Sequence, residues 1–210
     1  MIRRIALCFA LWPASLAAHP HIFVETALRL EVDPAGILQA VEVTWAYDEF
    51  YSLLIFEDLD LDSDLDGALT EAELTRLKGF DLNWSEGFQG DLYLSQGEAP
   101  VPLGPPEHLS TEVVDGVITT RHRRVLTGAP VVAQGVTVRP YDPTYYTAYD
   151  LNGGVQVDGP CLASIALPDL DAAYTKVEEL LYAMPADQVN DAYPEVGRAF
   201  ATTVSLDCES

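Results

Sequence analysis

Twelve residues from Asp62 to Glu73 have the spacing of an EF-hand calcium loop. Such a loop supplies oxygen ligands from positions 1, 3, 5, 7, 9 and 12, and a glycine at position 6 permits the sharp turn between them. In this chain Gly67 is the sixth residue of the segment and Glu73 is the twelfth. The predicted Ca²⁺ ligands are the side chains of Asp62, Asp64, Asp66, Thr70 and Glu73, and the backbone carbonyl of Ala68.

Asp58 and Asp60 extend the alternation of aspartates, so the aspartates alone do not define the register of the loop. The glycine at position 6 and the carboxylate at position 12 define it. A frame that began at Asp60 would place Leu65 at the glycine position and Ala72 at the last ligand. Mg²⁺ tolerates seven oxygen ligands poorly, so calcium is the expected ion, and an unpaired loop is expected to bind it weakly, with Kd about 10⁻⁴ to 10⁻³ M. We expect a structural calcium site, and the alternative is a solvated acidic loop.

A second set of possible ligands lies near the N-terminus, where His19 and His21 flank a proline and Glu25 follows. Residues at every second position of a strand share a face. Imidazole and carboxylate groups bind Zn²⁺, Ni²⁺ or Co²⁺. His108 or His122 could complete a four-ligand site, and His108 is favoured because three arginines surround His122. The alternative is that the two N-terminal histidines simply begin a strand.

The elements expected to position these residues follow from the spacing of apolar side chains. Residues 21–32 and 37–47 alternate in polarity around a turn, which predicts a β-hairpin. Residues 48–80 are expected to form an EF-hand-like insert, with a short helix before the acidic loop and a helix over 70–79 after it.

The rest of the chain indicates strands followed by helices. Residues 91–157 read as β-structure, in which Asp115 and Gly116 form the turn of a second hairpin. Helices are expected over 169–183 and 186–202. The order predicts one α+β domain over 19–210, with a mainly antiparallel, sandwich-like sheet and C-terminal helices.

The first 18 residues have the pattern of a cleavable signal peptide: two arginines, an apolar run from Ile5 to Trp12, and small residues. Cleavage is expected after Ala17 or Ala18. The apolar run is far shorter than the roughly 20 residues that cross a bilayer, and no later stretch is long enough, so we expect no membrane insertion.

The charge of the chain restricts its partners and its chemistry. It has 11 Lys and Arg against 33 Asp and Glu, a formal net charge of -22. Phosphate backbones and anionic lipids are repelled by such a protein, so nucleic acid is not an expected partner and cations are. There is no nucleophile elbow, phosphate loop, dinucleotide fingerprint or zinc-protease motif, so no enzymatic activity is predicted.

Cys161 and Cys208 are the two cysteines outside the signal peptide. In an oxidising compartment they predict one disulfide. The alternative is a thiolate metal site or a redox pair, but no C-x-x-C spacing supports it.

The strand at 19–25 (HPHIFVE), the acidic loop, and residues 141–146 (YDPTYY) together resemble the family called domain of unknown function 1007. The resemblance covers nearly the whole mature chain. It implies a periplasmic accessory of transition-metal handling, encoded near nickel/cobalt exporters or zinc-uptake systems, with a membrane metal transporter as its partner. Taken alone, Tyr141-Asp142-Pro143 is a turn between strands. The alternative is that Asp142 adds a metal ligand.

The combined prediction is an exported, periplasmic calcium-binding protein that holds or passes Zn²⁺, Ni²⁺ or Co²⁺ through its N-terminal histidines. One alternative is a calcium-dependent interaction or structural protein with no transition-metal site. The other is a calcium-stabilised enzyme.

Overall fold

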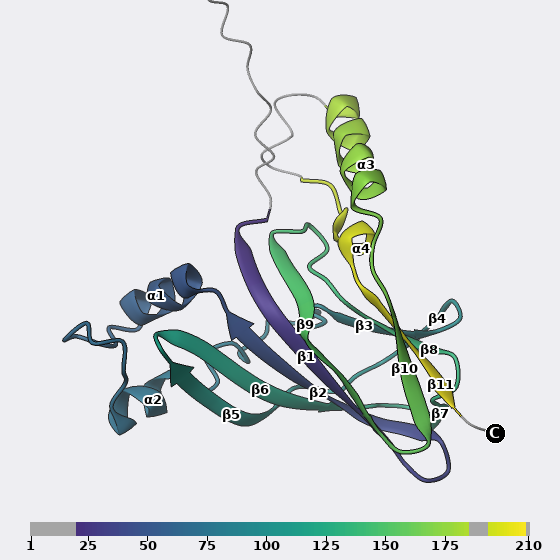
Figure 1. The fold of residues 1–210 in the computed structure, drawn as a ribbon, viewed down its shortest axis with the longest axis horizontal. Helices are drawn as coiled ribbons and strands as arrows, with labels where there is room; N and C mark the ends of the chain where they lie inside the picture. The colour runs from purple at the N-terminus through teal and green to yellow at the C-terminus, as the bar shows by residue number, and fades with distance from the viewer. Residues whose placement is uncertain (1–19, 185–192, 209–210) are drawn as a thin grey trace, which may run out of the picture.

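The computed structural model describes residues 20–184 and 193–208 (Figure 1). Its longest hairpin joins β1 (Ile22–Val32) to β2 (Ile37–Tyr47). Alternate residues of both strands are buried, so one face of the hairpin is apolar. Asp33 forms the turn by accepting hydrogen bonds from the N–H groups of Ala35 (2.9 Å) and Ile37 (3.0 Å). The hairpin predicted over 21–32 and 37–47 is confirmed.

The hairpin lies at the centre of the larger sheet, whose strand order is β5-β6-β2-β1-β9, with β7 paired to β2. The outer strands are β5 (Glu107–Val114), β6 (Val117–Val125), β7 (Val131–Val132) and β9 (Thr147–Asp158). All pairs in this sheet are antiparallel except β1 and β9, which run parallel. The predicted turn at Asp115-Gly116 joins β5 to β6, as expected.

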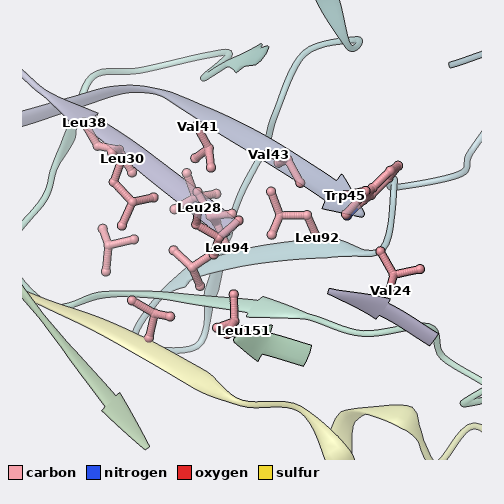
Figure 2. Packing of buried hydrophobic residues seen from close by; sticks show 14 of the residues in the cluster. Val24, Leu28, Leu30, Leu38, Val41, Val43, Trp45, Leu92, Leu94 and Leu151 are labelled. Carbon is pink, nitrogen blue, oxygen red and sulfur yellow. The ribbon is translucent and has the colours of Figure 1, made fainter. Parts of the chain in front are cut away.

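A smaller antiparallel sheet has the order β10-β11-β8-β3-β4. Its strands are β3 (Leu92–Gln96), β4 (Ala99–Val101), β8 (Val136–Pro140), β10 (Cys161–Ala166) and β11 (Thr203–Cys208). Side chains from both sheets share one buried cluster, which includes Leu28 and Val43 of the larger sheet and Leu94 of the smaller one (Figure 2). The predominance of β-sheet, mostly antiparallel, is confirmed.

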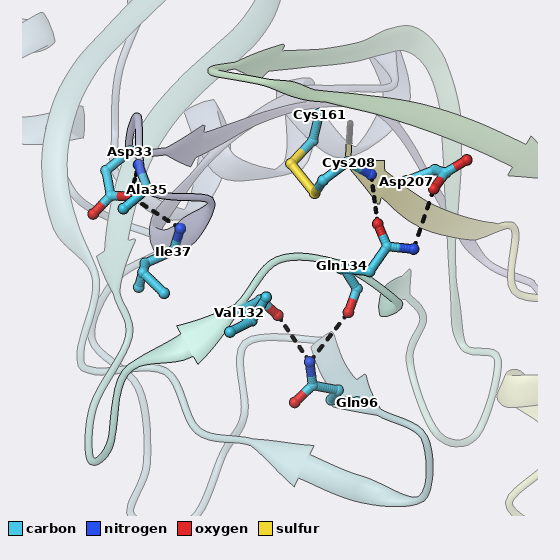
Figure 3. Close-up of a disulfide and its surroundings, with 9 residues drawn as sticks. All are labelled: Asp33, Ala35, Ile37, Gln96, Val132, Gln134, Cys161, Asp207 and Cys208. Carbon is cyan, nitrogen blue, oxygen red and sulfur yellow. Dashed lines mark hydrogen bonds between the residues drawn. A yellow bond between two sulfur atoms is a disulfide. The ribbon is translucent and has the colours of Figure 1, made fainter. Parts of the chain in front are cut away.

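A disulfide joins Cys161 to Cys208, which face each other in the pairing of β10 with β11 (Figure 3). Beside it, the Gln134 side chain accepts a hydrogen bond from the Cys208 N–H (2.6 Å) and donates one to Asp207 (3.1 Å). The predicted pairing of these cysteines is confirmed.

Four helices accompany the sheets within residues 20–184 and 193–208. α1 (Glu49–Asp58) and α2 (Glu71–Leu77) form a helical insert between β2 and β3, and α3 (Leu170–Ala183) follows β10. α4 (Gly197–Phe200) leads into β11. No helix in the described ranges is long and apolar enough to cross a membrane.

The second C-terminal helix predicted over 186–202 is wrong within the described part of that range, while residues 186–192 lie outside it. Only α4 is helical there, and the chain then enters β11. Gly197 explains the local path, because its N–H donates to Pro143 O (2.8 Å) and a side chain on it would overlap the Asp142 carbonyl. Val204 and Leu206 then alternate into the core as strand residues.

Candidate metal centre

The carboxylates of Asp62, Asp64 and Asp66 converge in the loop between α1 and α2. One oxygen from each lies within 4.8 Å of the others. Within residues 20–184 and 193–208, no other group of three or more His, Cys, Asp or Glu side chains meets this criterion. Asp62 is buried, with 6% of its surface exposed, while Asp64 and Asp66 are exposed. The structure thus brings together the residues predicted for loop positions 1, 3 and 5.

The loop curls around the side chain of Asp62. Its Oδ1 accepts the N–H of Asp66 (3.0 Å) and its Oδ2 accepts the N–H of Gly67 (3.1 Å). Gly67 has a φ of 76°, a left-handed conformation that glycine adopts without steric cost. The N–H of Ala68 in turn donates to Asp66 Oδ1 (2.8 Å). Backbone donors therefore hold two of the three carboxylates in place.

Glu73 closes the loop from its far end. Thr70 is the N-cap of α2, and its N–H (2.8 Å) and hydroxyl (2.7 Å) both donate to Glu73 Oε2. The N–H of Asp62 donates to Glu73 Oε1 at 3.1 Å. The hydrogen bonds from Thr70 are the main reason that the pKa of Glu73 is lowered. The residues predicted for the first, ninth and twelfth positions are thus connected by hydrogen bonds.

The acidic loop packs against the core of the domain. Leu69 packs against the main core, and Leu77 of α2 is fully buried in it. A methyl group placed on Gly67 would lie 3.9 Å from the Gly116 nitrogen, so the loop contacts the turn between β5 and β6. The hairpin turn therefore occupies a position beside the acidic loop.

The N-terminal candidate ligands are only partly described. His19 lies outside the described residues. His21 is exposed, its N–H donates to Tyr146 O (2.8 Å), and its ring lies 4.8 Å from the Tyr146 ring. Glu25 is exposed on β1, and the parallel pairing of β1 with β9 places it directly beside Asp150. Asp150 was not among the predicted ligands.

His108 lies away from these residues. It is paired with His122 across β5 and β6, His122 is paired with Val43 of β2, and Val43 is paired with Leu28 of β1. This row belongs to the buried face of the sheet, whereas Glu25 lies on the opposite face. At about 4.8 Å per strand, His108 is on the order of 15 Å from β1. Its Nε2 instead forms a 2.9 Å hydrogen bond with Thr111.

His122 is the buried histidine of the sheet, with 1% of its surface exposed and neither ring nitrogen hydrogen-bonded. Its ring packs against Trp45 (4.6 Å) and Trp84 (5.8 Å). Burial, assisted by the charge of Arg124, lowers the pKa of His122 to about 3. The alternation of β6 directs Arg121 and Arg123 to the other face, so the three arginines do not surround His122 as the linear order suggested.

Two aspartates, the half-buried Asp81 and the buried Asp91, were not predicted from the sequence as notable residues. Asp81 Oδ2 accepts hydrogen bonds from Tyr47 (2.9 Å) and Thr120 (2.6 Å), and Asp91 Oδ2 accepts one from Tyr149 (2.9 Å). Burial raises the pKa of Asp91 to about 7. Neither aspartate belongs to a motif, and their partners come from strands distant in the sequence. Their burial against tyrosines identifies them as internal polar anchors.

The segment Tyr141-Asp142-Pro143 is a corner between β8 and β9. Asp142 Oδ1 accepts the N–H (2.8 Å) and the hydroxyl (2.9 Å) of Thr144, and Oδ2 accepts the N–H of Thr147 (3.0 Å). With both carboxylate oxygens engaged in the turn, Asp142 has the geometry expected of a structural corner.

A search of curated proteins gave no match. Residues 4–208, nearly the whole chain, match the family model described as a protein of unknown function (DUF1007). The match spans the N-terminal strand, the acidic loop and the corner at 141–146 on which the resemblance was based. This chain therefore belongs to the DUF1007 family.

Proposed function

We propose that this protein binds one Ca²⁺ in the loop from Asp62 to Glu73. The observation that carries the proposal is the convergence of three carboxylates within 4.8 Å. With Ca²⁺–oxygen bonds of about 2.3–2.6 Å, two ligands of one ion are at most about 5 Å apart, so the separation fits calcium. The ligand set is completed by Glu73, the Ala68 carbonyl and Thr70.

The bound ion stabilises the insert rather than acting as a switch. Without a cation, three carboxylates repel one another at short range. Glu73 already holds the two ends of the loop together through Thr70 and Asp62, so calcium joins a loop that is largely formed. An exported protein meets calcium at concentrations that keep a weak site filled.

Isothermal titration calorimetry with Ca²⁺ and Mg²⁺ tests the proposal. Asp64→Asn is the most informative variant, because the Asp64 side chain is exposed and takes part in none of the hydrogen bonds found in the described part of the chain. We expect at least about tenfold weaker calcium binding, since a charged ligand is lost. Asp58→Asn, on α1 outside the loop, is the matched control and should bind normally. Unchanged calcium binding by Asp64→Asn would refute the site.

We also propose, as a second candidate, that the protein is a periplasmic accessory of transition-metal handling and acts through His19, His21 and Glu25. The family relationship suggested this role, and the supporting observation is that His21 and Glu25 are both exposed at the start of β1. The disulfide fits an oxidising compartment such as the periplasm. The proposal assigns His108 no part and gives the protein no catalytic step.

Elemental analysis of protein purified from the periplasm tests this second candidate. We expect Zn, Ni or Co in about equal amount to protein, and loss of that metal in the His21→Ala variant. His108→Ala is the control, since His108 lies on the other face of the sheet, and it should retain the metal. N-terminal sequencing of the same sample establishes whether His19 or Ala18 is the first residue.

A further inference from the structure

The exposed face of the larger sheet has two halves that differ in charge. In one half, every arginine is paired: Arg29 with Asp158 (2.7 Å), Arg121 with Glu42 (2.9 Å) and Arg123 with Glu31 (2.7 Å). These pairs cross from strand to strand and neutralise the carboxylates of that half. They show how this sheet face accommodates acidic residues when a cation is available.

The other half, near α1, lacks such cations. Glu25 and Asp150 are register partners on β1 and β9, so their carboxylates project from the same face. No Lys or Arg of the described ranges lies within salt-bridge distance of either one. Like charges directly opposite each other destabilise a sheet. A cation from another molecule would relieve this repulsion.

A groove with an apolar floor lies beside the two carboxylates. It has a volume of about 860 Å³, and Phe23 of β1 and Phe50 of α1 line it. Both rings are solvent-exposed, Phe23 by 55% and Phe50 by 66%. Two outward-facing residues of its lining, Ala46 of β2 and Ala148 of β9, are small and leave the floor low. Figure 1 shows β1 and β9 side by side, with α1 near the same end of the sheet.

The groove adjoins a second, smaller cavity. Tyr145, Ala148 and Asp150 line both hollows. The smaller one has a volume of about 290 Å³, room for one aromatic or long aliphatic side chain. One wall is formed by Tyr145 and Phe200, whose rings stack 3.8 Å apart. Asp150 therefore stands between an open apolar groove and a pocket for a single side chain.

We propose that this groove binds a segment of a partner protein that carries Lys or Arg next to apolar side chains. Its cation would lie between Glu25 and Asp150, an aromatic or aliphatic anchor would enter the smaller cavity, and further apolar residues would cover Phe23 and Phe50. Among the described residues, the lining of the two hollows contains carboxylates but no Lys or Arg, and this charge complementarity selects a basic segment. A cation over an aromatic ring adds attraction. The site is separate from the calcium loop, and it shares Glu25 with the transition-metal candidate, so the two proposals assign that carboxylate to different cations.

A random dodecapeptide phage library, selected on the immobilised protein in calcium buffer, tests this proposal. The double variant Phe50→Ala/Asp150→Asn serves for counter-selection. We expect enriched peptides with Lys or Arg beside an aromatic or aliphatic residue. Absence of enrichment, or enrichment of acidic or uncharged peptides, would overturn the proposal. So would selected peptides that bind the double variant equally well.

Fluorescence anisotropy with an enriched peptide then separates specific docking from attraction by net charge. Phe50→Ala and Asp150→Asn should each weaken binding by about tenfold, the size expected for a central contact. Glu178→Gln removes an exposed carboxylate on α3 that lines neither hollow, and should change the affinity less than twofold. An equal loss in Glu178→Gln would show that overall charge alone attracts the peptide, and the proposal would then be wrong. Both altered groove residues are exposed, and circular dichroism verifies that each variant is folded.

Discussion

The backbone N–H of Asp62 donates a 3.1 Å hydrogen bond to Oε1 of Glu73, eleven residues later. This contact closes the acidic loop and places the carboxylate predicted for its last position beside the first. The same carboxylate accepts two hydrogen bonds from Thr70, so it already has a defined orientation before any ion is considered. Glu73 is therefore positioned to be the calcium ligand at the last position of the loop, a role that substitution can test.

Glu73→Gln should abolish stabilisation by calcium. At a free calcium concentration tenfold above Kd, binding is expected to stabilise the wild type by about 1.4 kcal/mol, or about 3–5 °C in melting temperature. A neutral amide is a poorer bidentate ligand, so the variant should show no shift. Differential scanning calorimetry with calcium or with chelator measures this. Glu71→Gln, in the same helical turn, should keep the full shift; a full shift in Glu73→Gln would exclude its role as ligand.

Thr70→Ala should destabilise the protein even in chelator, because Thr70 forms a reciprocal capping box with Glu73 at the start of α2. Loss of an N-cap side chain costs about 1 kcal/mol. Thr70→Ser retains the hydroxyl and should recover most of the loss. Urea unfolding curves of the three proteins provide the comparison, and equal midpoints for Thr70→Ala and the wild type would contradict it.

Features that depend on neighbouring residues could be predicted from the sequence. The β1–β2 hairpin follows from alternating side chains and a turn at Asp33, and the convergence of Asp62, Asp64 and Asp66 follows from the spacing of one short loop. The cysteine pairing was predictable because, with Cys8 assigned to the predicted signal peptide, the two remaining cysteines allow one connectivity.

Features that depend on distant pairing could not. Nothing near Glu25 indicates that β9, more than a hundred residues later, runs parallel to β1 and places Asp150 beside it. The distance between His21 and His108 likewise depends on the strand order, since β6 and β2 lie between β5 and β1. At the C-terminus, the strand from Thr203, which pairs with β10 and β8, was not predicted, because its partners are distant in the sequence.

Replacing Cys161 and Cys208 by alanine should lower the free energy of unfolding by about 2–4 kcal/mol, because the disulfide restricts the unfolded chain across a separation of 47 residues. Chemical denaturation in non-reducing buffer measures the difference. Added reductant should destabilise the wild type and leave the double variant unchanged. Similar stability of the two proteins without reductant would contradict a structural role for the bond.

Asp91→Asn should remove a loss of stability that accompanies rising pH. Burial raises the pKa of Asp91 to about 7 in the folded protein, compared with about 3.9 in an unfolded chain. Between these values the folded state holds the extra proton, so the free energy of unfolding decreases as pH rises from about 4 to 7. Asparagine cannot ionise and can still accept the Tyr149 hydrogen bond. Urea unfolding curves recorded across this pH range give the free energy of unfolding at each pH. Its slope against pH should be more positive in Asp91→Asn than in wild type, whereas the exposed control Asp115→Asn should match wild type.

His122→Gln should have the opposite effect on the pH profile. The folded protein keeps His122 neutral down to about pH 3, because the ring is buried beside Arg124, whereas an unfolded histidine takes up a proton near pH 6.5. The unfolded state therefore binds the extra proton between these values, and the free energy of unfolding falls as pH decreases from about 6.5 to 3. Glutamine does not titrate, so the free energy of unfolding of His122→Gln should fall less steeply as pH decreases, even if the variant is less stable at neutral pH. His108→Gln, a partly exposed control on the neighbouring strand, should retain the wild-type slope, and a wild-type slope in His122→Gln would show that the buried imidazole does not contribute to acid unfolding.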